Sequence, residues 1–269
     1  MHQFDFTASS FDPAGSGACH LSLCCGSDGL TLLIHDLSAE QLLVCRHYPF
    51  TSSGYQLLLR KIREIISREE IFKLSFGKTT IFLGEKQLTL VPESLYTPRM
   101  AEMLFPPVKK HDSGLETVVV PVPETAAYLL FRTGKDVYDY LSLTFPGAEF
   151  RHELNPLLHL PEGQESILFF HLHDSWFYAV AKEHGKLLMA NSYEFRSPND
   201  LLYYALAVSR EFNPENHPVV LSGWIAADDS RLETLRKYIP GLEWAGDMNT
   251  LQESGEDRSF RSFYGLFRR

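Results

Sequence analysis

The chain has 269 residues, of which 44% are hydrophobic and 13% aromatic, enough to bury one large or two ordinary cores. Thirty-four acidic against twenty-five basic residues give a net charge of −9, which repels polyanions and excludes nucleic acid as a main partner. The N-terminus lacks the basic and apolar regions of a signal peptide, and no stretch approaches about eighteen uninterrupted apolar residues. We therefore expect a cytoplasmic protein with no transmembrane segment.

Three strand-like runs follow one another near the N-terminus, and short turns separate them. They are Leu21–Cys25, Thr31–His35 and Gln41–Tyr48. Ser27, Asp28 and Gly29 between the first two are typical of a type I′ hairpin turn. This pattern predicts a three-stranded antiparallel meander.

All four cysteines fall in this first fifth of the chain: Cys19, Cys24, Cys25 and Cys45. Histidines lie among them, so a zinc site is one interpretation. However, Cys24 and Cys25 are neighbours in a strand, and their side chains point to opposite faces. We expect buried free thiols, which suit a reducing cytoplasm.

A helix and a strand are predicted after the first meander. Ser53 and Gln56 have the spacing of a capping box, and an apolar stripe follows them. The run Phe72–Phe76 is interpreted as the next strand. The rest of the first half is predicted as a strand-like run, a helix, a strand and a helix: Gln87–Val91, Pro92–Phe105, Thr117–Val120 and about Glu124–Leu143.

The second half repeats this order of elements. Its expected strands are Ser166–Leu172, Trp176–Ala181 and Lys186–Ser192, followed by His217–Leu221. Ser197 is expected to cap a helix that begins at Pro198, and a further helix is expected over Asp228–Ile239.

The two halves also share a motif. Tyr48, Phe50 and Ser52 recur with the same spacing as Tyr193, Phe195 and Ser197. We predict an internal duplication with one half over residues 1–155, a second over residues 156–245, and a polar linker and tail over residues 246–269. The boundary lies in the Pro- and Gly-containing stretch Asn155–Gly163. The alternative is two unrelated α/β domains that share spacing.

Three segments carry a resemblance to a known family: His20–Asp36, Leu88–Tyr96 and Leu187–Ile225. They resemble an uncharacterised family found in Bacteroidetes, domain of unknown function 3822. The duplicated order of elements is similar to that of the actin-like ATPase superfamily, in which two ribonuclease-H-like halves flank a nucleotide. The resemblance implies an α/β fold with mixed sheets, a meander at the start of each half, and no established activity.

The resemblance also indicates where a nucleotide would bind. Active members of the superfamily carry an Asp in the first hairpin that orients Mg²⁺, and glycines beside it that cradle phosphate. Here Gly26, Ser27, Asp28 and Gly29 form that hairpin, but Leu or Cys occupies the strand position of the Asp. Asp28 lies at the tip instead, so the Mg²⁺-directing carboxylate is missing.

The second hairpin and the adenosine-binding loop match the superfamily weakly. His173, Asp174 and Ser175 include no glycine, and Ser222 and Gly223 supply one glycine of the usual two. These residues and those of the first hairpin are candidate binding residues only if a nucleotide binds in the cleft between the two halves. We predict no catalytic residue, no cofactor and no metal.

Two histidines on one strand allow a metal-binding interpretation. His171 and His173 face the same way, but no third ligand can be assigned. We interpret them as residues of a partly exposed strand end.

Beyond Trp244 the composition changes to a polar linker and an aromatic, basic end. Its aromatic residues recur on one helical face: Phe260, Phe263, Tyr264 and Phe267. A docking peptide for a protein partner or a membrane surface is one interpretation, and a frayed or folded-back tail is the other.

The sequence as a whole favours a degenerate actin-like fold that serves as a non-catalytic binding or scaffolding module, a pseudoenzyme. The alternative is a divergent ATP-binding enzyme, an ATPase or small-molecule kinase, in which Asp28 or Asp174 holds the metal from a shifted position.

Overall fold

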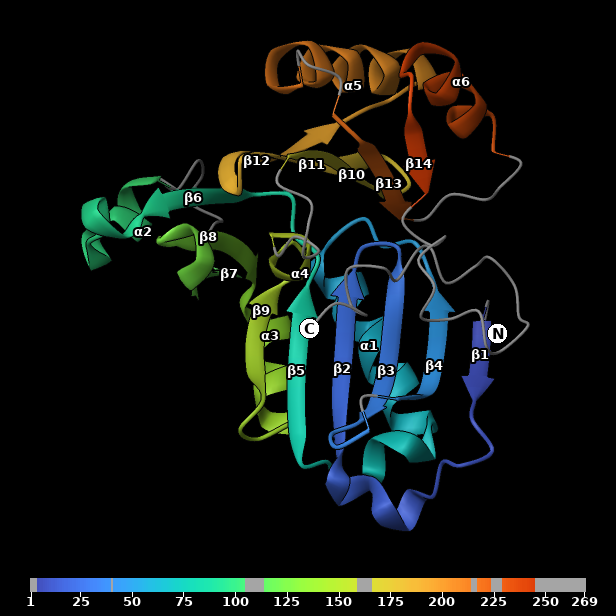
Figure 1. The fold of residues 1–269 in the computed structure, drawn as a ribbon. Helices are drawn as coiled ribbons and strands as arrows, with labels where there is room; N and C mark the ends of the chain where they lie inside the picture. The colour runs from blue at the N-terminus through green and yellow to red at the C-terminus, as the bar shows by residue number, and fades with distance from the viewer. Residues whose placement is uncertain are drawn as a thin grey trace. The chain divides into compact units, whose positions relative to one another are not determined.

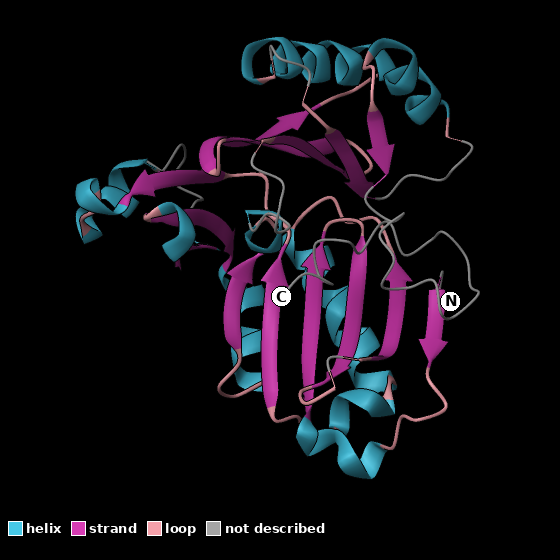
Figure 2. Ribbon diagram, in the orientation of Figure 1, coloured by secondary structure: helices cyan, strands magenta, loops and turns pink. Residues whose placement is uncertain are grey.

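The computed structural model describes residues 4–39, 41–104, 114–158, 166–213, 217–223 and 229–244. Strands and helices are mixed throughout these ranges, so the predicted α/β class is confirmed (Figures 1 and 2). The chain separates into two compact units. The first comprises Met1–Glu85, Glu93–Pro121 and Tyr128–Glu153, and the second comprises Lys86–Pro92, Val122–Ala127 and Leu154–Arg269.

The first unit is built on a six-stranded mixed sheet with the order β1-β4-β3-β2-β5-β9. Its strands are β1 (Phe4–Thr7), β2 (Cys19–Gly26), β3 (Gly29–Asp36), β4 (Leu42–Pro49), β5 (Lys78–Leu83) and β9 (Glu149–His152). β2, β3 and β4 form the predicted antiparallel meander, while β5 and β9 run parallel to β2. The long helices α1 (Tyr55–Arg68) and α3 (Lys135–Thr144) lie together on one face of this sheet (Figure 2).

Shorter elements complete the first unit and its connections. They are η1 (Pro13–Ala18), η2 (Glu70–Lys73), η3 (Glu93–Leu95), α2 (Pro98–Leu104), β7 (Leu115–Val122) and β8 (Ala127–Gly134). β7 and β8 are hydrogen-bonded neighbours. The predicted strand Thr117–Val120 is therefore confirmed as part of β7.

The second unit has a five-stranded sheet with the order β12-β11-β10-β13-β14. Its elements are β6 (Leu88–Pro92), η5 (Pro123–Thr125), α4 (Asn155–Leu158), β10 (Ile167–Leu172), β11 (Trp176–Glu183), β12 (Lys186–Glu194), α5 (Pro198–Phe212), β13 (Val219–Gly223), α6 (Ser230–Tyr238) and β14 (Leu242–Trp244). α5 and α6 lie over the same face of the sheet (Figure 1). Their apolar side chains pack with those of the strands into one core around Phe170, Phe177 and Leu232.

The two sheets share one order of strands. In each, the third, second and first strands of an antiparallel meander are followed by two strands parallel to the first. The meander at the start of each half is thus confirmed, with β1 added to the edge of the first. This shared order supports the internal duplication, which we retain as a proposal.

The predicted strand Phe72–Phe76 is wrong. Ile71 and Phe72 are buried in the 3₁₀ turn η2, and the strand begins only at Lys78, opposite His20 of β2. A short apolar run does not by itself distinguish a turn from a strand. Pairing with β2 decides where the strand begins. The segment Lys78–Leu83, which is rich in β-branched residues, is the one that pairs with β2.

The predicted helix from about Glu124 to Leu143 is also wrong in its first half, where β8 lies. Ala126 has a φ of 47° in the left-handed region, which ends any helix that includes it. Gly134 marks the change from β8 to α3, because a Cβ at this position would lie 2.5 Å from Cγ of Tyr55. Packing against α1 therefore sets the start of α3.

Two local turn predictions fail for conformational reasons. α1 begins after Gly54 without a side-chain cap, so the capping box at Ser53 is wrong. Ser27 and Asp28 both lack the positive φ that a type I′ turn requires, so that turn type is wrong as well. In the part of the chain that the structure describes, the hairpin between β11 and β12 is the one with two adjacent residues of positive φ, His184 at 49° and Gly185 at 75°.

The predicted cap of α5 is confirmed, and it yields a direct test. The Ser197 hydroxyl accepts a hydrogen bond of 3.2 Å from the Asp200 backbone N–H. Replacing Ser197 with Ala should lower the free energy of unfolding by about 1 kcal/mol, because one helix N–H loses its partner. Chemical denaturation measures this effect. Ser53→Ala, at an exposed position without a capping contact, is the control and should change stability by less than about 0.5 kcal/mol. Equal effects of the two substitutions would contradict the cap.

Candidate functional site

The first hairpin is held by backbone hydrogen bonds to the segment after β4. Gly26 and Gly29 pair directly across the turn. The carbonyl of Ser27 accepts from Ser52 N at 2.7 Å, and that of Asp28 accepts from Phe50 N at 3.3 Å. These contacts fix the hairpin that the sequence had singled out as a phosphate-binding turn.

Packing accounts for one of the two glycines of this hairpin. A Cβ on Gly29 would collide with Cε1 of His47, a ring that is fully buried. A Cβ on Gly26 would lie 3.0 Å from Oδ1 of Asp28. Gly29 therefore makes room for the buried His47 ring of the same unit, whereas the side chain near Gly26 is the movable end of Asp28.

His47 itself is a buried, neutral group. Its Nδ1 lies 2.9 Å from the Thr31 hydroxyl, and burial lowers the pKa of His47 to about 3. The imidazole is therefore uncharged at neutral pH and supplies no positive charge to the hairpin beside it.

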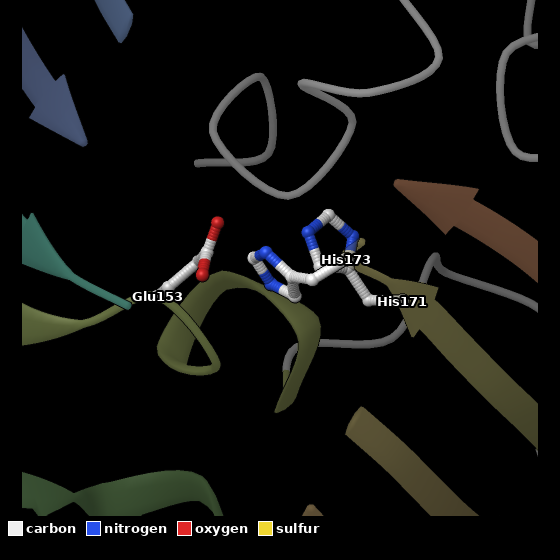
Figure 3. Close-up of side chains that lie close together, drawn as sticks. All are labelled: Glu153, His171 and His173. Carbon is white, nitrogen blue, oxygen red and sulfur yellow. The ribbon is translucent and has the colours of Figure 1, made fainter. Parts of the chain in front are cut away.

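A buried carboxylate lies at the carboxyl ends of β2 and β5. Glu153 directly follows β9, and its backbone N–H donates to Leu83 O at 3.0 Å. The Cys24 thiol donates to Oε1 at 3.4 Å, and Oε2 lies 2.7 Å from where a Cβ on Gly84 would be. That same Cβ position is 3.4 Å from Cα of Gly26. The carboxylate of Glu153, drawn in Figure 3, thus adjoins the Gly84 backbone, which in turn lies close to Gly26.

Glu153 is the principal site residue that the sequence analysis missed. The available signal was an acidic residue directly after a strand, at the edge where the parallel strands end. The signal can be used only if β9 is known to lie beside β5. The sequence of a four-residue strand does not indicate which distant strand it pairs with.

The cysteines are buried free thiols, as predicted. Burial raises the pKa of Cys24 and of Cys25, and the nearby Glu153 raises both further. These thiols are therefore protonated and unreactive at neutral pH.

The second hairpin is exposed at its tip and fixed at its base. Asp174 and Ser175 are exposed, and the Ser175 carbonyl accepts from Phe195 N at 2.9 Å. Arg231 donates to the Asp174 carbonyl at 3.2 Å. The same guanidinium lies 2.7 Å from a carboxylate oxygen of Asp229 and holds the pKa of that carboxyl below its usual value. Asp174, a candidate nucleotide-binding residue from the sequence, is a turn residue in this geometry.

The histidines at the end of β10 are buried, so their predicted position at a partly exposed strand end is wrong. His171 and His173 are 2% and 1% exposed. Both side chains are drawn in Figure 3. His171 Nδ1 lies 2.6 Å from the Ser222 hydroxyl, and the His173 ring stacks on Trp176 with centroids 3.8 Å apart. The neighbours of the two rings within this unit include Ser222, Trp176 and Tyr178, which β11 and β13 bring beside β10.

Ser222 and Gly223 are also explained by packing. Ser222 is fully buried, so its hydroxyl is closed to a substrate although it faces an imidazole. Gly223 has a φ of 115°, and a Cβ there would collide with the Leu172 backbone beside it in the parallel ladder. β10 and β13 thus bring Ser222 and Gly223 close to the hairpin residues His173–Ser175. The two residues form a packed strand end there rather than an open loop.

Solved structures similar to this chain define the class of fold. A Bacteroides thetaiotaomicron protein with an actin-like ATPase fold and unknown function is 20% identical, with a TM-score of 0.76 over 87% of this chain and 93% of that one. The PilM-PilN type IV pilus biogenesis complex matches with 14% identity and a TM-score of 0.52 over 92% of this chain and 97% of that one. The chain has the actin-like ATPase fold, as its resemblance implied.

The family is equally clear. A model of the protein family of unknown function DUF3822 matches residues 8–242, and the chain belongs to this family. No curated protein matches the chain. None of the helices in the described ranges has the length and apolar character needed to cross a bilayer.

The residues of the first unit do not fit the nucleotide that the fold class implies. A phosphate approaching the Gly84 backbone beside the first hairpin would meet the Glu153 carboxylate. Without a cation between the two anions, an ionised carboxylate would repel the phosphate, and a protonated carboxylate would still fill the space.

Proposed function

We propose that this protein is a non-catalytic binding or scaffolding module of the cytoplasm, built on an actin-like fold whose nucleotide chemistry has been lost. The observation that carries the proposal is the buried carboxylate of Glu153 against Gly84, beside the first hairpin. The strand position of the missing Mg²⁺-directing Asp supports it, because β2 places Cys24 and Cys25 there, and both are buried.

A protein partner suits this proposal better than a small substrate. One solved neighbour is a chain of the PilM-PilN type IV pilus biogenesis complex, so a chain of this fold can function by assembly. We propose that the C-terminal aromatic residues Phe260, Phe263, Tyr264 and Phe267, which lie outside the described residues, contribute to partner binding. Deleting the last twelve or so residues, from Arg258 on, should then reduce partner or vesicle binding without changing the thermal stability of the two units.

Calorimetric titration with ATP and ADP tests the loss of nucleotide chemistry. We expect no binding heat from the wild-type protein at millimolar nucleotide, with or without Mg²⁺. The control is the Asp28→Ala, Asp174→Ala double variant, which removes the two hairpin carboxylates that the divergent-enzyme alternative assigns to a shifted metal site. Mg²⁺-dependent binding that this double variant abolishes would overturn the proposal and establish the divergent ATP-binding enzyme.

A Glu153→Gln variant tests the carrying observation separately. The substitution keeps the shape of the side chain and removes its charge, so charge repulsion of a phosphate disappears. Nucleotide binding that appears only in Glu153→Gln would show that the carboxylate excludes phosphate. Wild-type binding of equal strength would show that the carboxylate does not.

A further inference from the structure

The second unit contains a groove that plays no part in the function proposed above. Its volume is about 710 Å³, and β12, β6 and η5 line it. Apolar side chains predominate, among them Leu88, Leu90, Leu188 and Ala190. Of the described lining residues, Lys186 alone carries a charge.

The groove runs along the edge of β12 rather than over one face of its sheet. β12 is the last strand in the order of the five-stranded sheet, and β11 is its ladder partner. Every residue from Lys186 to Asn191 lines the groove. Successive side chains of a strand point to opposite faces, so a groove that touches all of them lies beside the backbone edge.

Beside the Asn191 end of the groove, β12 contacts the segment before β6. The Ser192 hydroxyl donates to the Lys86 carbonyl at 2.6 Å, and Lys86 Nζ lies 3.4 Å from a carboxylate oxygen of Glu194. From this point β6 runs on toward Pro92 while the groove follows β12 back toward Lys186. The two strands belong to different sheets, and the space between them is the groove.

A β-bulge exposes an aliphatic side chain on this edge. Met189 pairs with Ala181 and Leu187 pairs with Lys182, so Leu188 is the extra residue. The Leu188 side chain is 46% exposed and lines the groove. A molecule bound in the groove would remove this apolar surface from water.

We propose that the groove binds an extended aliphatic peptide segment of a protein partner, which adds a strand to β12. The edge of β12 requires an extended backbone with alternating N–H and C=O groups, and Lys186–Asn191 accommodates about six residues. The lining selects aliphatic side chains, and Lys186 selects an acidic residue at its own end of the groove. The basic tail of this chain, with Arg258, Arg261, Arg268 and Arg269, is disfavoured by the same charge. This inference rests on the proposed binding role and names its partner's chemistry.

The test uses the full chain and a library of random hexapeptides displayed on phage. We expect selection of extended aliphatic sequences with one acidic terminal residue, and the best of them, synthesised with a fluorescent label, is the probe for anisotropy titrations. Leu188→Arg should weaken its binding at least about tenfold, because an apolar contact is replaced by a charge. Tyr203→Arg, on an exposed residue of α5 outside the groove, should leave binding unchanged.

Two further measurements probe the mode of binding. Lys186→Glu should weaken binding of the acidic peptide about threefold to fivefold, and a peptide with Lys in place of the acidic residue should recover it. N-methylation of alternate peptide amides should abolish binding in one of the two registers, because strand addition needs those N–H groups.

Four outcomes would overturn the inference: no enrichment of peptides, equal binding by the Leu188→Arg variant, indifference to N-methylation in both registers, or tighter binding of a peptide of residues 256–269 than of any selected peptide. None of these bears on the nucleotide titration, whose positive result would overturn the proposed function instead. The two proposals therefore fail separately.

Discussion

Replacing Gly223 with Ala should destabilise the second unit by about 4 kcal/mol or more. The residue has a φ of 115°, where an L side chain is strained, and its Cβ would collide with the Leu172 backbone in the parallel ladder between β10 and β13. A backbone atom cannot turn aside as a side chain can, so the two strands would have to separate. Thermal unfolding and limited proteolysis of the second unit measure the effect.

Gly185→Ala is the matched control for this prediction. Gly185 also has a positive φ, at 75°, but no atom lies within 4 Å of its Cβ position. This control should cost only about 1 to 2 kcal/mol, the conformational strain without the collision. Losses of similar size for both glycines would contradict the close approach of Gly223 to β10.

Acid should destabilise the first unit through His47. Burial lowers the pKa of His47 to about 3, whereas an unfolded histidine has a pKa of about 6.5. Because the folded pKa is the lower one, the stabilisation is complete above pH 6.5 and is lost as the pH falls toward 3. The loss between pH 7.5 and pH 4.5 should be on the order of 3 kcal/mol, about two pKa units of linkage.

The measurement compares denaturation of the wild type and His47→Gln at both pH values. Glutamine can still hydrogen-bond the Thr31 hydroxyl but does not titrate, so the variant should lose about 3 kcal/mol less on acidification. His184→Gln, at an exposed position in the second unit, should follow the wild-type pH dependence. Parallel pH profiles for wild type and His47→Gln would contradict a buried neutral imidazole at position 47.

The residues of the candidate site show how far the sequence could lead. The hairpin Gly26–Gly29 and the strand end at Ser222 were found because turns and strand ends have local signatures. The sequence could not show whether these groups bind phosphate, because the side chains that contact the glycines belong to other segments of the chain. His47 contacts Gly29 from β4, and Glu153 contacts Gly84 after a separation of about seventy residues.

The sequence by itself determined the local parts of this protein: the two meanders, the cap of α5 at Ser197 and the burial of the four cysteines as free thiols. Alternation, turn composition and capping depend on neighbours within a few residues, so they can be read along the chain. The tertiary structure decided where β5 and β8 lie, and it buried His171 and Glu153. A strand forms where a partner strand offers hydrogen bonds, and a polar group is buried where distant segments enclose it, so neither outcome is encoded in adjacent residues.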